Sequence, residues 1–566
     1  MSAQTPAPEV VCASREEPID SKVSLVIEDC IVKSRVTGAS IPDVDFATFF
    51  TEAWHKYEDR AALVDEKTGS QYTFGELLDV CRRVAAGLRT LGLRPRDVVA
   101  FHGPTSSDLL VAVCGTFFAG GTAALIKDNL TEGESVIQIE DAQPKFVFCD
   151  GDNMQRTEQG FIPLSGDSRG ATSLSQLKQH PVDECEPQVK ICPDSVLVII
   201  YSSGTTGLPK GVQLTHRNVI AQVIIYGLLG PSVFHKDDTV LCPAPMMHIA
   251  GFWVFLGALG NGCKLILFHT ADIGAILLAI EKHKPTALTL YPTFLAKLEE
   301  HPLLERVDTS SVGKLMIGGN SANSSVLQRL LAKLGLKGLS QVYGMTELTS
   351  CIAYSTPEMN DFRSVGKPGP FVEMKVVEEC TRRALGPHEH GEICVKSPGA
   401  FKAYHNNPKA TAEAYENGFV RTGDLGYYNP DGCFFLCGRL KELIKCMDQQ
   451  VAPAELEELL SSDPQVRHVV VIGVPHPKYG EAARAYVVPK RPIRPGSIEE
   501  QTEAKRLQEL VAGHFAVYKH LHAGVEFLES IPRSSIGKIL RNSLQEAYAQ
   551  LYCKALKRDD GESRQH

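Results

Sequence analysis

One loop of the sequence gathers several groups that can bind phosphate. Residues 201–211 read YSSGTTGLPKG, with three glycines, four serine or threonine hydroxyls and Lys210. Backbone N–H groups of a glycine-rich turn, together with hydroxyls and an ammonium group, can surround phosphate oxygens. The loop is not a G-x-x-x-x-G-K-[ST] motif, because Lys210 lies three residues after Gly207 and is followed by Gly211. The sequence therefore indicates phosphate binding and disfavours an ordinary P-loop NTPase.

This loop follows one of several strand-like runs that alternate with helical segments. Aliphatic and β-branched runs occupy 196–200, 264–268, 287–291 and 314–318, and apolar residues at helical spacing occur at 271–283 and 325–334. Short buried strands that alternate with helices predict an α/β fold with largely parallel sheets.

The pattern changes after about Asn429. Strand-like runs at 434–437 and 468–474 flank a short Glu-rich helical segment at 453–462, which predicts a smaller α+β unit. The charged segment 438–441 is a candidate hinge, and a plain surface connection is equally compatible with its residues.

The composition excludes several classes of protein. Of the 566 residues, 43% are hydrophobic and 22% are charged, which is typical of a globular protein and not of a disordered chain. The chain has 58 Lys and Arg against 67 Asp and Glu, so a general basic surface for nucleic acid is not expected. Sixteen scattered cysteines without a C-x-x-C pair predict reduced thiols in a cytosol-like compartment.

No targeting or membrane segment is expected. The first twenty residues lack the apolar run of a secretory signal, and the chain ends in Arg-Gln-His where a peroxisomal address has Ser-Lys-Leu. The apolar stretch 109–126 contains glycines and barely reaches the length of a membrane span, so it predicts a buried helix, a glycine turn and a strand. We therefore expect a cytoplasmic protein without a transmembrane segment.

The loop YSSGTTGLPKGV closely resembles the phosphate loop of the adenylate-forming superfamily: acyl- and aryl-CoA ligases, firefly-type luciferases and peptide-synthetase adenylation domains. Further segments resemble motifs of this family in the family's order. They are YGMTE at 343–347, GEI at 391–393 (which opens a GE(I/L)…Y…(N/D)P…T run), RTGDL at 421–425, GRLKE at 438–442 and PRSSIGK at 532–538. The resemblance covers about residues 45–550 and is closest in wording to the 4-coumarate–CoA ligase and luciferase branch.

The resemblance implies both an architecture and a reaction. It implies a large multi-sheet N-terminal adenylation domain at 21–438 and a small mobile α+β C-terminal domain at 439–553. The composition of the two ends predicts flexible arms at 1–20 and 554–566. In the implied reaction a small fatty or aryl carboxylic acid attacks the α-phosphorus of ATP, and the acyl-adenylate then passes its acyl group to coenzyme A. ATP, Mg²⁺ and coenzyme A are the implied cofactors, and no oligomeric state is indicated.

The resemblance also implies which residues bind ATP. The phosphates are assigned to the loop, the adenine to two strand ends and the ribose to two residues before the hinge. These residues are Ser202, Ser203, Gly204, Thr205, Thr206, Gly207, Lys210; Gly318, Gly319, Asn320, Tyr343, Gly344, Met345; and Asp424, Arg439. An ionised aspartate only accepts hydrogen bonds, which suits the two ribose hydroxyls.

Catalytic roles follow from the same resemblance. Lys538 is implied to bridge the carboxylate and the α-phosphate, two anions that repel each other. Thr346 is implied to reach the α-phosphate, and Glu347 is implied to bind Mg²⁺ through oxygen. Lys441 matches the pivot between two domain orientations, and Lys445 matches the face used for the CoA step.

The acyl pocket is implied to include His248, Ala250, Gly251 and Val342. A polar histidine in an apolar pocket would orient the substrate. Valine stands at position 342 where the family usually has glycine, so we expect a narrower pocket.

Two further departures concern residues near the pocket mouth and the CoA path. Asn320 and Ser321 replace small residues after Gly318-Gly319 and add polarity. Asp448 replaces a family glycine that allows close approach of the pantetheine arm, which puts thioester formation in question more than adenylation.

Two alternatives to a CoA ligase follow from these departures and from the family. One is a luciferase-like adenylating monooxygenase, and the other is a nucleotide-binding relative with an impaired CoA step. The presence of Lys538, Glu347 and Asp424 argues against the second.

Overall fold

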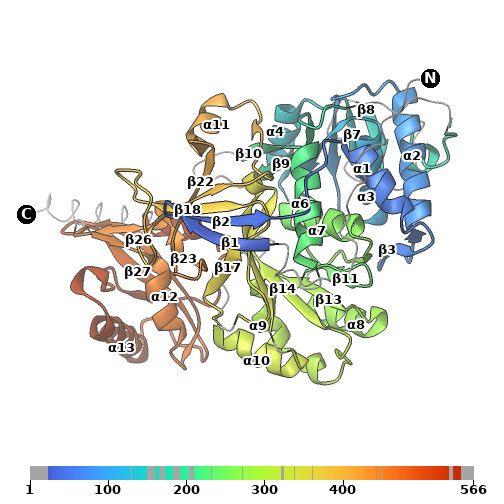
Figure 1. Ribbon diagram of the computed structural model, residues 1–566. Helices are drawn as coiled ribbons and strands as arrows, with labels where there is room; N and C mark the ends of the chain where they lie inside the picture. Colours follow the sequence, from blue (N-terminus) through green and yellow to red (C-terminus); the bar gives the residue numbers. More distant parts are fainter. Residues whose placement is uncertain are drawn as a thin grey trace, which may run out of the picture.

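The computed structural model describes residues 23–128, 130–149, 160–164, 172–182, 191–202, 209–230, 233–270, 272–319, 324–336, 338–359, 361–447, 449–533 and 539–549. These residues form three sheets, of sixteen, seven and five strands, with helices packed against them. In Figure 1 the C-terminal part, in orange and red, forms a smaller lobe beside the main body. The predicted α/β class is confirmed.

The seven-stranded sheet contains the strands that flank the phosphate loop. Its order is β20 (Ala403–Tyr404), β10 (Lys210–Thr215), β9 (Val196–Ser202), β6 (Thr122–Ile126), β5 (Val98–His102), β7 (Phe146–Cys149) and β8 (Gly160–Pro163). Strand β9 reads VLVIIYS, a β-branched run that suits a buried strand. It runs parallel to β6 and antiparallel to β10, so the phosphate loop joins two neighbouring strands.

One half of the sixteen-stranded sheet is largely parallel, as predicted. Its strands are β15 (Ser340–Met345), β14 (Lys314–Gly318), β13 (Ala287–Leu290), β11 (Thr239–Cys242), β12 (Lys264–Leu267), β3 (Ala61–Asp65) and β4 (Gln71–Thr73), and β4 alone among these is antiparallel to its neighbour. The strand-like runs that the sequence shows near 264, 287 and 314 are confirmed as β12, β13 and β14.

The other half of this sheet is antiparallel. Its strands are β16 (Ser350–Tyr354), β17 (Ser364–Pro368), β23 (Phe434–Arg439), β22 (Phe419–Tyr428), β19 (Gly391–Lys396), β18 (Glu373–Val377), β2 (Ile31–Val36) and β1 (Val23–Glu28), with β21 (Tyr415–Glu416) paired to β22. The prediction of largely parallel sheets is wrong here, because β21, β22 and β23 are joined by turns too short for a parallel crossover.

The sequence pattern also misplaced one strand. The change of pattern after about Asn429 groups the run 434–437 with the small C-terminal unit, but the run lies in β23, which pairs with β22 and β17 of the large sheet. Local periodicity identifies a strand and does not identify its partner, which here comes from distant sequence.

Helices cover the sheets of the main body. They are α1 (Phe46–His55), α2 (Phe74–Thr90), α3 (Ser107–Phe118), α4 (Glu132–Ala142), α5 (Leu174–Leu177), α6 (His216–Leu229), α7 (Ile249–Gly260), α8 (Ile273–His283), α9 (Pro292–Glu300), α10 (Ser324–Leu334) and α11 (Pro408–Ala414), with short 3₁₀ turns η4 (Pro302–Glu305) and η5 (Thr346–Leu348). Capping boxes begin α2, at Thr73 and Glu76, and α4, at Thr131 and Glu134, and satisfy their first backbone N–H groups.

The C-terminal lobe has its own sheet and core. It contains β24 (Ile444–Cys446), β25 (Gln449–Val451), β26 (Val466–His476), β27 (Gly480–Pro489) and β28 (Val525–Phe527), with η6 (Leu440–Glu442), α12 (Pro453–Ser461), α13 (Ile498–His514) and η7 (Val517–Lys519). Leu456, Val471, Val487 and Leu507 are buried within it. A separate core is the mark of a separate domain.

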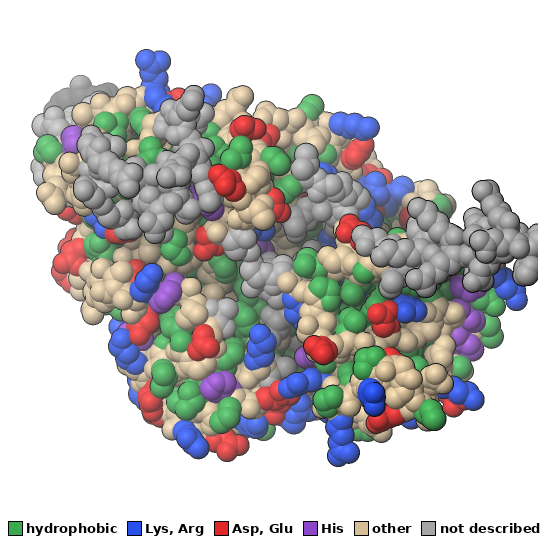
Figure 2. Space-filling view, turned by 180° about the vertical axis from the view of Figure 1, so that it is seen from behind, with side chains coloured by type: hydrophobic (Ala, Val, Ile, Leu, Met, Phe, Trp, Pro, Cys, Tyr) green, Lys and Arg blue, Asp and Glu red, His purple; other side chains and the backbone are tan. Residues whose placement is uncertain are grey.

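The apolar stretch 109–126 is buried in the main body. It forms most of α3, a turn at Gly120 and Gly121, and then β6, as predicted. Within the described residues, no helix is long and apolar enough to cross a membrane. On the face drawn in Figure 2, Lys and Arg side chains are interspersed with Asp and Glu.

Candidate active site

The phosphate loop and the YGMTE segment meet at Glu347. Strand β9 ends at Ser202 and β10 begins at Lys210, and these two residues are paired in the sheet. The Ser202 hydroxyl donates a hydrogen bond to Glu347 Oε1 at 3.4 Å. Glu347 lies in η5, directly after β15, and is buried. The loop residues Ser203, Gly204, Thr205, Thr206 and Gly207 lie outside the described residues.

Tyr404 joins the lysine and the glutamate of this cluster. Its hydroxyl donates to Glu347 Oε1 at 2.8 Å, and Lys210 Nζ lies 4.9 Å from the centre of its ring. Burial and the neighbouring Glu347 raise the pKa of Tyr404, so its hydroxyl stays a donor at neutral pH. Tyr404 had no assigned role in the sequence. The one signal in the sequence is that Tyr404 is the tyrosine of the family-like run that begins at Gly391.

The geometry around Glu347 fits a Mg²⁺ ion that is shared with nucleotide phosphates. In the described part of the chain, no group of three or more His, Cys, Asp or Glu side chains is arranged to hold a metal. Mg²⁺ is commonly bound by one or two carboxylates, with phosphate and water oxygens completing its shell. A single buried carboxylate beside Ser202 and Lys210 meets that requirement.

The turn that presents Glu347 depends on Gly344. A Cβ atom at this position would lie 1.7 Å from the Ser350 carbonyl oxygen, so only glycine fits. Thr349 and Ser350 have positive φ angles and reverse the chain into β16. Thr346 is buried at the start of η5, one residue before Glu347.

Asp424 accepts contacts from two elements. The Tyr343 hydroxyl donates to Asp424 Oδ2 at 2.7 Å, and Arg439 Nε lies 2.9 Å from Asp424 Oδ1. Asp424 and Arg439 are register partners on β22 and β23. Burial, then the Asp424 carboxylate, raises the pKa of Tyr343 well above its usual value, and Asp424 also raises the pKa of Arg439. Three sequence motifs therefore meet at one carboxylate, which two donors hold in place.

The two clusters lie close together along one segment. Tyr343 is in β15 and Glu347 is in the following turn, so only three residues separate the one that contacts Asp424 from the one that contacts Ser202. The Glu347 carboxylate also contributes to the raised pKa of Arg439. A nucleotide could place its ribose at one cluster and its phosphates at the other.

His248 and Tyr291 form a polar pair at the candidate acyl pocket. His248 caps α7, and its Nδ1 atom accepts hydrogen bonds from the Ala250 N–H at 3.2 Å and the Tyr291 hydroxyl at 3.1 Å. A Cβ on Gly319 would lie 3.3 Å from the Tyr291 ring. The tyrosine therefore connects the histidine with the end of β14. Sequence reasoning missed Tyr291, because nothing local distinguishes it from a core aromatic.

Val342 packs directly against Gly318. A Cβ on Gly318 would lie 2.5 Å from Val342 Cγ2, so the valine side chain fills the space beside the glycine. The two residues are register partners on β14 and β15. Gly251 has a different role, because the Pro245 carbonyl oxygen would lie 2.1 Å from its Cβ. It supports close packing of α7 and offers no side chain to a pocket.

The connection to the C-terminal lobe begins at the ribose cluster. Arg439 ends β23, and the exposed Lys441 follows in η6. Lys445 is exposed on β24, and its N–H donates to Glu481 Oε2 at 2.8 Å. Asn320, Ser321, Asp448 and Lys538 lie outside the described residues.

Comparison with known proteins places the chain in a family. The model of the AMP-binding enzyme family matches residues 50–405, and that of the AMP-binding enzyme C-terminal domain matches residues 455–538. The chain belongs to the AMP-binding enzyme family. This confirms the predicted resemblance and the two-part architecture.

Members of the AMP-binding enzyme family match almost the whole chain. This chain is 32% identical over 540 residues to 4-coumarate–CoA ligase 1 of Solanum tuberosum, and the match covers 92% of this chain and 97% of the relative. The ATP-bound structure of MatB from Rhodopseudomonas palustris is 28% identical, with a TM-score of 0.80 over 89% of this chain and 99% of that one. The amide bond synthetase McbA from Marinactinospora thermotolerans is 26% identical, with a TM-score of 0.79 over the same shares.

Proposed function

We propose that this protein is an ATP-dependent acid–thiol ligase. It activates a carboxylic acid as an acyl-adenylate with release of pyrophosphate, and then transfers the acyl group to coenzyme A with release of AMP. The observation that carries this proposal is full-length similarity to 4-coumarate–CoA ligases, combined with the Tyr343–Asp424–Arg439 cluster. A luciferase-like second step has no specific observation in its favour.

The proposed roles in adenylation follow from the two clusters. Asp424 accepts hydrogen bonds from the ribose hydroxyls while Tyr343 and Arg439 hold its carboxylate in place. Ser202 and Lys210 contact the phosphates, and Tyr404 orients Glu347 toward a Mg²⁺ ion. Bound Mg²⁺ would neutralise charge on the phosphates. Lys538 neutralises the carboxylate and the α-phosphate as they meet.

The proposed acid is narrow or of medium length. Val342 fills space beside Gly318 at a position where the family resemblance implies glycine, and Tyr291 lies at the neighbouring end of β14. A close-packed wall does not absorb extra volume freely, so bulky aromatic acids are expected to be poorer substrates.

The proposed CoA step uses a second orientation of the C-terminal domain. Lys441 is the proposed pivot, the domains are proposed to divide between residues 438 and 439, and Lys445 and Asp448 flank the path of the thiol. The location proposed for this reaction is the cytoplasm, and all thirteen described cysteines are free thiols, which suits a reducing compartment.

The test is pyrophosphate release across hexanoate, decanoate, palmitate, cinnamate and 4-coumarate, each with and without coenzyme A. We expect release that depends on the acid, and AMP and acyl-CoA production that depends on the thiol. Pyrophosphate release without any acyl-CoA would support the adenylation step and contradict the proposed CoA ligase activity. ATP hydrolysis that is indifferent to every acid would remove both.

A further inference from the structure

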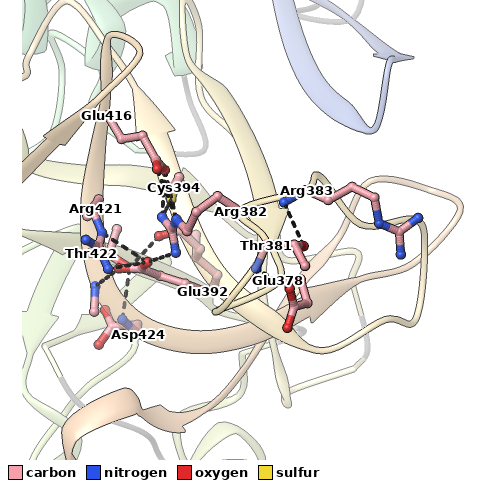
Figure 3. A network of polar contacts seen from close by, with 12 residues as sticks. Glu378, Thr381, Arg382, Arg383, Glu392, Cys394, Glu416, Arg421, Thr422 and Asp424 are labelled. Atoms are coloured by element: carbon pink, nitrogen blue, oxygen red, sulfur yellow. Dashed lines mark hydrogen bonds and ion pairs between the residues drawn. The ribbon is translucent and has the colours of Figure 1, made fainter.

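Glu392 is a carboxylate buried directly behind the ribose cluster. It lies on β19, is 1% exposed, and makes contacts through both oxygens. Oε1 accepts the Gly423 N–H at 3.2 Å, and Oε2 lies 2.6 Å from Arg382 Nη1. Figure 3 shows Arg382, Glu392 and Arg421 converging beside Thr422 and Asp424. Burying an ionised carboxylate is costly unless it is paired, so these partners decide whether Glu392 stays in place.

The segment that Glu392 contacts is a bulge that carries Asp424. Glu392 pairs with Leu425 and Cys394 pairs with Arg421, so three residues of β22 lie opposite one residue of β19. Gly423 has a φ of 70°, which favours glycine. Bulges beside active sites re-aim side chains, and this bulge turns Asp424 toward Tyr343 and Arg439.

Hydrogen bonds fix both sides of the bulge. The Thr422 hydroxyl donates to the Ile393 carbonyl at 2.7 Å, and the Asp424 N–H donates to Thr422 Oγ1 at 3.0 Å. The Gly423 N–H bond to Glu392 lies between them. A shift of Glu392 would therefore move the backbone directly before Asp424.

Arg382 is the cation that holds Glu392. Its Nη1 atom contacts Glu392, while its Nε and Nη2 atoms donate to Glu416 at 3.1 and 2.7 Å. Hydrogen bonding to Glu416 and then to Glu392 raises the pKa of Arg382. Arg421 also contacts Glu392, at 3.1 Å, but its side chain is 41% exposed against 22% for Arg382. The shorter and more buried contact is the stronger one.

We propose that Arg382, acting through Glu392, is a positioning residue for Asp424 and thereby sets the preference for a nucleotide with both ribose hydroxyls. The inference rests on the proposed function, in which Asp424 binds the ribose. Arg382 contacts no substrate in this account. It fixes the bulge so that the carboxylate meets the hydroxyls without reorganisation.

The experiment compares Arg382→Gln with Arg383→Gln as the matched control. In Figure 3 the Arg383 guanidinium points away from Glu392, and its backbone N–H contacts Thr381. Acid-dependent ATP–pyrophosphate exchange is measured with ATP, 2′-deoxy-ATP and 3′-deoxy-ATP, and thermal unfolding is measured alongside. Arg382→Lys tests partial rescue, because it keeps the charge and loses the bidentate geometry.

We expect Arg382→Gln to lower kcat/KM for ATP by about 10- to 100-fold, the scale of a lost charged hydrogen bond. The kcat/KM for the two deoxy nucleotides should fall less than that for ATP, so the preference for ATP becomes smaller. The KM for the acid should be unchanged. Arg382→Lys should fall between parent and Gln variant, and Arg383→Gln should match the parent. Glu416→Gln removes the charge of the second carboxylate that binds Arg382. It should also reduce the preference for ATP over the deoxy nucleotides, by a smaller amount.

Three outcomes would overturn the inference. The first is an equal loss with all three nucleotides, which marks a purely structural role. The second is a preference for ATP over the deoxy nucleotides that stays unchanged in both Glu416→Gln and Arg382→Lys. This result decides the question even if Arg382→Gln fails to fold. The third is a parent enzyme that uses deoxy nucleotides as well as ATP. That third result removes the ribose role of Asp424, and with it the inference, while acid-dependent exchange would still support the ligase.

Discussion

At Asp424 a hydroxyl and a guanidinium from different strands meet one carboxylate. The raised pKa values of Tyr343 and Arg439 keep both groups as hydrogen-bond donors to this carboxylate. The site is thus preorganised, since the carboxylate needs no rearrangement to accept further hydrogen bonds. Glu347 repeats the arrangement with Ser202 and Tyr404 as donors.

Lys538 gives the first prediction at the residue scale. Lys538→Ala should reduce acid-dependent ATP–pyrophosphate exchange by roughly 10²–10³-fold, as for the loss of one preorganised charge-stabilising donor. The exposed Lys490 of the same domain provides the control, and Lys490→Ala should leave exchange unchanged. A folded Lys538→Ala variant with near-parental exchange would remove this lysine from the mechanism.

Val342 gives the second prediction at the residue scale. Val342→Gly should improve kcat/KM for bulky or long acids relative to hexanoate by roughly 10- to 100-fold, the scale of relieved overpacking. The valine contacts Gly318, so its removal opens space at the end of β14. The measurement is a kcat/KM profile over the five acids named above. Superimposable profiles for parent and variant would show that Val342 is not a pocket wall.

At the scale of elements, Arg541 ties the C-terminal segment to the hinge. Its Nε atom lies 3.0 Å from Glu442 of η6, and its two Nη atoms pair with Glu457 of α12 at 2.6 and 3.0 Å. The Leu540 N–H donates to the Pro532 carbonyl at 3.0 Å, which joins two described residues on either side of the segment that contains Lys538.

Arg541→Ala should therefore lower adenylation by about 10- to 100-fold, because the base of that segment loses its charged anchor. Arg491→Ala, at an exposed arginine of the same domain, is the control. The informative measurement is a double-mutant cycle with Lys538→Ala, in which Arg541→Ala should add little further loss. Fully additive losses would mean that Arg541 does not act through Lys538.

His216 makes the junction of α6 and α1 sensitive to pH. Its Nδ1 atom accepts the Phe46 N–H at 3.0 Å, and burial lowers the pKa of His216 to about 4. The unfolded chain binds this proton near pH 6.5, so stability is full above that value and falls as pH decreases toward 4.

Between pH 7 and pH 5 the His216 contribution to the free energy of unfolding should fall by about 2 kcal/mol. Urea unfolding at both values checks this by comparison with His216→Gln, which lacks the titrating group. The parent should lose more stability than the variant. Equal losses would show that His216 is not the group responsible.

At the scale of the whole molecule, the two domains share few strong contacts among the described residues. Arg467 of β26 lies 3.4 Å from Glu300 of α9, and both side chains are more than half exposed. Exposed pairs of this kind contribute about 1 kcal/mol or less. The main body and the lobe have separate cores, which suits a lobe that changes orientation between two half-reactions.

The sequence predicted the parts that local patterns encode. The β-branched runs became β9, β12, β13 and β14, and residues of separate motifs are in contact at Ser202 and Glu347 and at Tyr343 and Asp424. Tyr404 and Tyr291 were not predicted as site residues, because each contacts a partner distant in sequence. Arg382 was not predicted either, because it reaches Asp424 only indirectly, through Glu392 on the next strand. The antiparallel half of the large sheet was missed for the same reason, since strand pairing is set by tertiary contacts.

The most direct test of the account follows the oxygen atoms of the acid. The best acid substrate is labelled with ¹⁸O in its carboxylate and converted in the presence of ATP and coenzyme A. The ¹⁸O content of each product is then measured by mass spectrometry. If the carboxylate attacks the α-phosphorus and the thiol then attacks the acyl carbon, AMP must leave with one ¹⁸O atom and pyrophosphate with none. Unlabelled AMP, or label in pyrophosphate or inorganic phosphate, would contradict the account.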